Sequence, residues 1–157
     1  MRRTSIWVIA VIVSVVAAGF AAYAGAATKT KKRSYTVTLT GATIGSHGNT
    51  GEAAYKVRSS LDGAGAALQE VKVSGSAFPL SGTDTVTTYY ANGVAKAKDK
   101  FTLSALDANG ISKINGSGKC VGGTRVHKNE KCKFTFSGTY NSKTTVVRAK
   151  IKGTDTR

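Results

Sequence analysis

The segment GTDTVTTYYANGVAKAKDKFTL, residues 82–103, places two alternating runs on either side of an Asn-Gly pair. Before the pair, Val86 and Tyr90 share one parity; after it, Phe101 and Leu103 share a parity opposite to three lysines. Period-two alternation is typical of strands with one buried and one exposed face. Asn-Gly between two such runs is the strongest short signal for a hairpin. The segment therefore predicts two antiparallel strands joined by a tight turn.

The same pattern recurs along the rest of the chain from residue 34. With this hairpin, the predicted strands lie near residues 35–40, 53–58, 71–73, 85–90, 95–103, 111–118, 132–140 and 147–152. Turn sequences such as Asp62-Gly63 and Asn109-Gly110 separate them, whereas 41–51 and 75–82 are predicted as longer loops. We predict a single all-β domain over residues 34–157. Its expected form is an eight-stranded antiparallel up-and-down barrel, with a β-sandwich as the alternative.

The first 26 residues have the layout of a secretory signal peptide. Arg2 and Arg3 precede an apolar stretch, and small residues of the Ala-x-Ala kind follow it. We predict a signal helix that is cleaved after Ala24 or Ala26. The alternative is an uncleaved membrane anchor, because the apolar stretch can be extended to about twenty residues. Both put the domain outside the cytoplasm, secreted or in the cell envelope, behind a flexible basic leader at 27–33.

The chain is strongly basic. It has 23 Lys+Arg against 8 Asp+Glu, a net charge of +15. Cleavage of the signal peptide would remove Arg2 and Arg3 and so lower the net charge by two. Such a surface attracts anionic polymers or cell-surface components; the alternative is a solubilising surface without a dedicated partner. Candidate anion-binding residues on a loop and a strand are Arg125, His127, Lys128, Lys131, Arg148, Lys150 and Lys152. Because the aromatic residues fall mostly on the opposite, inward parity, we expect no specific nucleic-acid recognition.

Two cysteines enclose the most basic segment, GKCVGGTRVHKNEKCKF at residues 118–134. An even pair outside the cytoplasm is normally oxidised, and Cys132 shares the inward parity of Phe134. We predict a Cys120–Cys132 disulfide that closes the basic loop. The alternatives are a catalytic thiol or a zinc site with His127, but the sequence has no paired Cys-x-x-Cys and no fourth ligand. We expect no metal and no other cofactor.

Gly- and Thr-rich motifs in the C-terminal half follow a known pattern. After the hairpin come GSGKCVGGT (116–124), CKFTFSGTY (132–140) and IKGT (151–154). This arrangement resembles small secreted bacterial proteins of the allene oxide cyclase-like and dirigent-like barrel group, although Arg125 stands where their pattern has glycine. The resemblance implies an eight-stranded barrel and allows an isomerase or cyclase that acts on a hydrophobic substrate inside it. It carries over no catalytic residue.

One acid falls on the predicted inward face. Asp99 shares the parity of Phe101, so a regular strand would bury it, while a bulge or rim position would leave it in water. Candidates for a polar site in a cavity are Asp99, Tyr55, Tyr90 and Gln69. The sequence contains no Ser-His-Asp order, no closely spaced pair of acids and no phosphate-binding loop, so no catalytic residue is assigned.

These observations favour a secreted, non-enzymatic barrel that binds an anionic surface or a small apolar ligand. The alternatives are an isomerase or cyclase working inside the barrel, and an envelope-anchored structural protein. An open interior containing Asp99 and a tyrosine would favour a ligand or substrate site, whereas a filled interior would exclude it.

Overall fold

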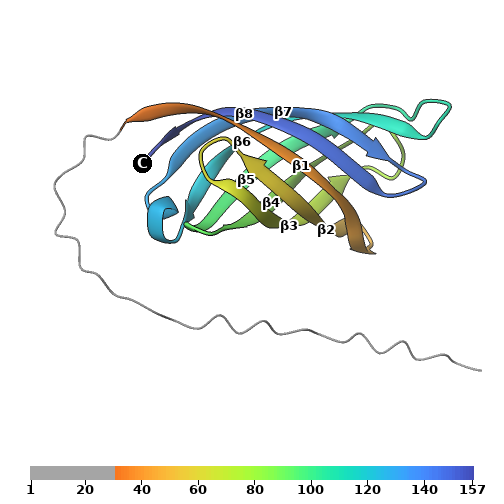
Figure 1. Cartoon of the computed structure of the whole chain (residues 1–157). Helices are drawn as coiled ribbons and strands as arrows, with labels where there is room; N and C mark the ends of the chain where they lie inside the picture. The colour runs from red at the N-terminus through yellow and green to blue at the C-terminus, as the bar shows by residue number, and fades with distance from the viewer. Residues whose placement is uncertain (1–30) are drawn as a thin grey trace, which may run out of the picture.

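The computed structural model describes residues 31–157, which form one closed β-barrel (Figure 1). Its strands are β1 (Lys32–His47), β2 (Thr50–Ser59), β3 (Gly63–Ser74), β4 (Leu80–Tyr90), β5 (Gly93–Leu103), β6 (Ile111–Gly123), β7 (Lys131–Asn141) and β8 (Val146–Thr156). A short 3₁₀ turn, η1 (Arg125–His127), lies between β6 and β7. The predicted signal peptide and the first part of the basic leader lie outside the described residues.

The barrel closes through its first and last strands. Each strand is antiparallel to its neighbours in sequence, and β1 also pairs with β8 from Lys32–Thr156 to Ala42–Val146. A sandwich would leave edge strands unpaired. The predicted up-and-down barrel is therefore confirmed and the sandwich alternative is wrong. No helix within residues 31–157 is both long and apolar enough to cross a membrane.

Alternation along the strands separates an apolar inner face from a charged outer face. The densest part of the core is made by residues of β1, β2 and β3 that share the inward parity: Val37, Ala53, Tyr55, Val57 and Ala67. Lysines, arginines and threonines occupy the outward positions between such residues. The period-two pattern thus places one kind of side chain inside the barrel and the other outside it.

Interior glycines explain part of the high glycine content, because six of them lie beneath an aromatic ring of the directly paired residue. A methyl group added at Gly118 would lie 2.5 Å from the ring of Phe134. The glycine–aromatic pairs are Gly41–Tyr55, Gly65–Tyr90, Gly82–Phe101, Gly116–Phe136, Gly118–Phe134 and Gly153–Tyr35. Pairing a small residue with a large ring lets the sheet curve tightly while the ring is buried.

The predicted loop at 41–51 is wrong. β1 continues to His47 and β2 begins at Thr50, so only a two-residue turn separates them. Its four glycines are typical of a loop, but Gly41 fits beneath Tyr55, and a bulge between Thr43 and Gly45 keeps the two strands paired. The predicted loop at 75–82 is shorter than expected, because β4 begins at Leu80.

The predicted disulfide is present. Cys120 of β6 and Cys132 of β7 are bonded, with their Cα atoms 4.9 Å apart. The bond extends the β6–β7 ladder beyond its last pair, Lys119–Lys133, and closes the loop that carries η1. Because both sulfurs are in the bond, the alternatives of a zinc site and a reactive thiol are wrong. The disulfide is consistent with an extracytoplasmic location.

Replacing Cys120 and Cys132 together with serine is expected to leave the barrel folded, because the eight-stranded ladder does not depend on the bond. The free energy of unfolding should fall by about 2–4 kcal/mol. Trypsin should cut faster at Arg125, Lys128 and Lys131, which are exposed in the loop. Chemical denaturation and limited proteolysis measure the two effects. Unchanged stability, or two titratable thiols in denatured, unreduced wild-type protein, would contradict the prediction.

Candidate functional site

The interior of the barrel is open. It contains a cavity of about 420 Å³, lined by side chains from all eight strands. Most of these side chains are apolar, and the volume lies within the range of small-molecule sites. Two polar features interrupt the apolar wall: a chain of four side chains across β2–β5, and an ionic cluster at the end of the barrel where β8 finishes.

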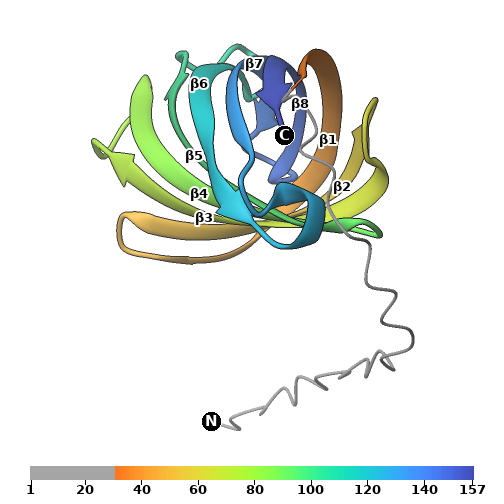
Figure 2. The same ribbon diagram turned by 90° about the vertical axis from the view of Figure 1, so that its left-hand side faces the viewer.

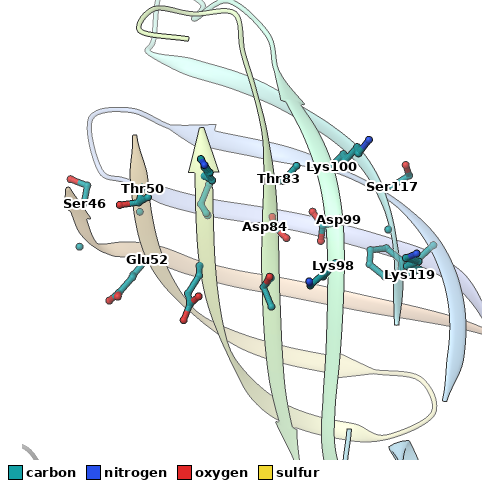
Figure 3. Close-up of a pocket in the computed structure, with 18 of the residues that line it drawn as sticks. Ser46, Thr50, Glu52, Thr83, Asp84, Lys98, Asp99, Lys100, Ser117 and Lys119 are labelled. Carbon is teal, nitrogen blue, oxygen red and sulfur yellow. The ribbon is translucent and has the colours of Figure 1, made fainter. Parts of the chain in front are cut away.

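The first polar feature joins four consecutive strands. The Tyr55 hydroxyl of β2 donates to Oε1 of Gln69 on β3, and Nε2 of Gln69 donates to Oδ2 of Asp84 on β4. Asp84 is paired directly with Asp99 of β5. Figure 3 shows the two carboxyl groups pointing toward each other from neighbouring strands. We call Asp84 and Asp99 the carboxyl pair.

The carboxyl pair is deeply buried, since Asp84 is 6% and Asp99 9% exposed. Burial, followed by the hydrogen bond and negative charge of Asp84, raises the pKa of Asp99 to about 9. Burial also raises the pKa of Asp84, against hydrogen bonds from Asp99 and Gln69. Two adjacent buried carboxyls cannot both ionise readily, so the pair holds a proton at neutral pH. Burial raises the pKa of Tyr55 as well, so its hydroxyl stays a donor.

All four residues predicted for a polar cavity site line the cavity: Asp99, Tyr55, Tyr90 and Gln69. The alternative that a bulge turns Asp99 into water is wrong, because the bulge lies just before Ala97 and Asp99 keeps its inward direction. Tyr90 is not part of the polar chain; its ring stacks on His127, with centroids 5.7 Å apart. Asp84 was missed, and with it the close pair of acids that the linear sequence lacks.

The second polar feature lies at the end of the barrel that Figure 2 faces, where β8 finishes. Arg157 donates to both carboxylate oxygens of Asp62, at 2.7 and 2.9 Å, and to Asp155 at 2.6 Å. Nδ1 of His127 lies 2.7 Å from a carboxylate oxygen of Glu130. We call these five residues the end cluster. All of them are largely buried.

The inclusion of His127 among the exposed anion-binding residues is wrong, because this side chain is 1% exposed. η1 packs against the end of the barrel, where glycine leaves room: a methyl group at Gly123 would lie 2.8 Å from Cβ of His127. The remaining candidates of this segment stay exposed on η1, the loop after it and the first residue of β7, and we call them the loop cations: Arg125, Lys128 and Lys131.

No protein-family model, curated protein sequence or solved structure matches this chain. The likeness to the allene oxide cyclase-like and dirigent-like group stays a prediction. A function for the barrel therefore has to be argued from its own side chains.

Charge is divided between the inside and the outside of the barrel. Of the eight acids, only Glu52, Glu70 and Asp107 are exposed, whereas 18 lysines and arginines within residues 31–157 are exposed. On β8, the predicted row Arg148, Lys150 and Lys152 faces outward, and each member lies between a hydroxyl residue of β1 and one of β7. We call it the β8 row. The exterior is more cationic than the net charge alone indicates.

A groove of about 1120 Å³ runs over the outer faces of β3–β7, beside the β1–β2 turn (Figure 3). Lys98, Lys119 and Lys133 are cross-strand neighbours in it, and Glu52 and Glu70 face each other on its other side. Sequence analysis missed this lysine row, because only the strand registers bring its members together. The groove is open to solvent, so a small apolar molecule is better enclosed by the cavity.

Proposed function

We propose that the barrel binds a small, mostly apolar molecule in its interior. The observation that carries this proposal is the cavity of about 420 Å³, whose apolar wall contains the polar chain from Tyr55 to Asp99. Small-molecule sites combine an apolar lining with a few polar groups that orient the ligand. Burying two acids in a core costs stability, which supports a use for them beyond folding.

Titration with the uncharged dye N-phenyl-1-naphthylamine, which fluoresces in apolar surroundings, tests the proposal. Anionic dyes are unsuitable because the cationic exterior would bind them. Ala97→Leu fills part of the cavity and should weaken dye binding about tenfold. Ala66→Leu makes the same change on the outer face of β3 and should have no effect. Wild-type protein that binds no neutral apolar probe, or equal effects of the two variants, would overturn it.

The carboxyl pair favours a second candidate, the isomerase or cyclase that the resemblance allows. One protonated and one ionised carboxyl beside a phenol can supply a general acid and a general base. Incubation with a ligand extracted from the protein, followed by NMR of the recovered molecule, separates the two functions. Conversion that Asp99→Asn abolishes would support the enzyme. Recovery of the unchanged ligand would support binding alone.

We also propose that the protein is exported and that its signal peptide is removed. The disulfide and the Ala-rich end of the apolar stretch support this proposal. N-terminal sequencing of exported protein should begin at Gly25 or Ala27. A sequence that begins at Met1 would instead support the membrane anchor and the envelope-anchored structural role.

The cationic exterior supports attachment to anionic polymers of the cell surface. The exported protein should bind a heparin column at low salt and be released below about 1 M salt, where screening is nearly complete. Replacing the β8 row with glutamine should lower the salt needed for release more than replacing the loop cations, which removes the same charge. Strand positions between hydroxyl residues hold the β8 row in place. Retention that does not change with salt would contradict electrostatic binding.

A further inference from the structure

The polar chain in the cavity ends in free hydrogen-bond acceptors. Tyr55 uses its hydroxyl on Gln69, and Gln69 uses its Nε2 on Asp84. Oδ1 of Asp84 and Oδ1 of Asp99 have no hydrogen-bond partner within residues 31–157. Both hydrogen bonds are thus donated in the direction of the carboxyl pair, and no group within residues 31–157 donates to its two Oδ1 atoms. A buried acceptor without a donor is costly, and both residues line the cavity, so a donor carried by a molecule in the cavity would relieve that cost once the buried carboxyls turn toward it.

The described chain supplies no positive charge to the carboxyl pair. His127 and Arg157 line the cavity, but both belong to the end cluster, where Arg157 pairs with Asp62. No lysine, arginine or histidine within residues 31–157 forms an ion pair with Asp84 or Asp99. The pair is thus an acidic corner in a mostly apolar cavity, without an ion-pair partner of its own within residues 31–157.

A metal ion fits this corner less well than an organic cation. Within residues 31–157, no group of three or more histidine, cysteine, aspartate or glutamate side chains is arranged to hold a metal. Calcium and magnesium ions take six or more oxygen ligands from protein or water, and the walls beside the pair are apolar, as at Phe134 and Val71. Apolar walls suit a hydrocarbon body attached to the cation.

We propose that the cavity takes an amphiphilic amine, and that Asp84 and Asp99 bind its protonated amino group. This inference rests on the proposed interior binding site and specifies the class of its ligand. The ammonium group would donate N–H to the two free Oδ1 atoms, and the proton shared by the carboxyls would leave to solvent. Hydrogen bonds between charged partners are about twice as strong as neutral ones, so the amine should be preferred over an alcohol with the same body.

Displacement of N-phenyl-1-naphthylamine by octylammonium, 1-octanol and octanoate tests the preference, because the three share a hydrocarbon chain and differ in the head group. Octylammonium should displace the dye from wild-type protein at a concentration about ten to a hundred times lower than 1-octanol. Octanoate should be the weakest. Attraction to the exterior cannot produce this order, because a cationic surface repels octylammonium and attracts octanoate.

Variants then assign the preference to residues. Asp84→Asn and Asp99→Asn should each reduce the preference for octylammonium over 1-octanol to about threefold or less. Glu70→Gln, which removes an exposed acid from β3, should leave this preference unchanged. Equal displacement by octylammonium and 1-octanol in the wild type would overturn the amine proposal while interior binding stands. This comparison needs no variant, so a variant that fails to fold does not affect it. If the dye does not bind, and if none of the three ligands (octylammonium, 1-octanol and octanoate) raises the melting temperature of the protein, the proposal of interior binding fails as well.

Discussion

Replacing Asp99 with asparagine is expected to stabilise the barrel by an amount that grows with pH. Burial, then the hydrogen bond and charge of Asp84, raises the pKa of Asp99 from 3.8 to about 9. Between these values the folded protein holds a proton that the unfolded chain has lost. The stability from this group is therefore full below pH 3.8 and falls by up to about 1.4 kcal/mol per pH unit until the pH passes the folded pKa. Asparagine does not titrate and avoids this loss.

Urea denaturation of wild type and Asp99→Asn at about pH 5 and about pH 8 measures the effect. Taking the difference between the two proteins removes the titrations that they share. The advantage of the variant in free energy of unfolding should be larger at the higher pH. Glu70→Gln is the control, because this acid is exposed, and its difference from wild type should be the same at both values. A difference for Asp99→Asn that does not grow would show that the carboxyl pair holds no proton.

The same substitution also tests whether Asp99 has a role in ligand binding. If Asp99→Asn gains stability and loses the preference for octylammonium, one substitution shows that the buried acid is costly for folding and useful for binding. Such a trade-off is typical of functional sites. A variant that gains stability and keeps the preference would leave the pair without a role in ligand selection.

The strands could be predicted because period-two alternation is a local property of the sequence. Closure of the barrel is not local, since it depends on pairing between β1 and β8 at opposite ends of the described chain. Strand number and short turns made a barrel the better prediction, but no residue pattern specifies the β1–β8 register. The interior glycines, such as Gly118 beneath Phe134, follow from that same register.

The carboxyl pair was missed because the hairpin signal gives the position of a turn but not its register. If the Asn-Gly pair at 92–93 formed the turn, Asp99 would face Val86. In the structure the turn lies one residue earlier, and Asp99 faces Asp84. Gly93 is then the first residue of β5 and packs beneath the loop that carries η1. A methyl group at Gly93 would lie 2.6 Å from the carbonyl oxygen of the residue before η1. This contact joins segments that are distant in the sequence, so no local pattern could predict it.

The end cluster had no signal in the sequence. Its acids and cations come from the β2–β3 turn, the η1 loop and the end of β8, and charged residues in turns and at strand ends are ordinarily exposed. The basic loop closed by the disulfide was interpreted as a surface for anions. The three loop cations remain exposed, so this interpretation still holds for them. His127 turns inward, where its Nδ1 contacts the carboxylate of Glu130 and its ring stacks on Tyr90. No local sequence pattern distinguishes it from its exposed neighbours.

Arg157→Met is expected to lower the free energy of unfolding by about 3–5 kcal/mol, the range for breaking a buried ion pair from one side. Arg157 donates to Asp62 and Asp155, and its Nε lies 3.6 Å from Glu130. Without it, Asp62 loses its arginine and Asp155 keeps only Arg33, which lies 3.1 Å away. Methionine retains much of the apolar stem, so the loss reflects the charge and its hydrogen bonds more than packing.

Two substitutions calibrate this loss. Arg148→Met removes an exposed arginine from β8, the strand that leads to Arg157, and should change stability little. Arg157→Lys keeps the charge but cannot donate to both oxygens of Asp62 in the same planar way, so its loss should be intermediate. Denaturant unfolding of the three variants at neutral pH gives the comparison. A loss for Arg157→Met no larger than that for Arg148→Met would mean that the end cluster makes no net contribution to stability.

The deficit of Arg157→Met should also shrink in acid. In the wild type, burial opposes the ionisation of Asp62, but hydrogen bonds from Arg157 and Asn92 outweigh it and lower the pKa of Asp62 below 3.8. Stability from a lowered pKa is present above the ordinary value and is lost as the pH falls through the folded pKa. Removing the arginine removes that stability, so the difference between wild type and variant should shrink as the pH falls below about 4. A deficit that is the same at neutral and acidic pH would assign the effect to lost packing. Because the end cluster lines the cavity, Arg157→Met should also release N-phenyl-1-naphthylamine faster than the wild type does, if the cluster closes that end of the barrel.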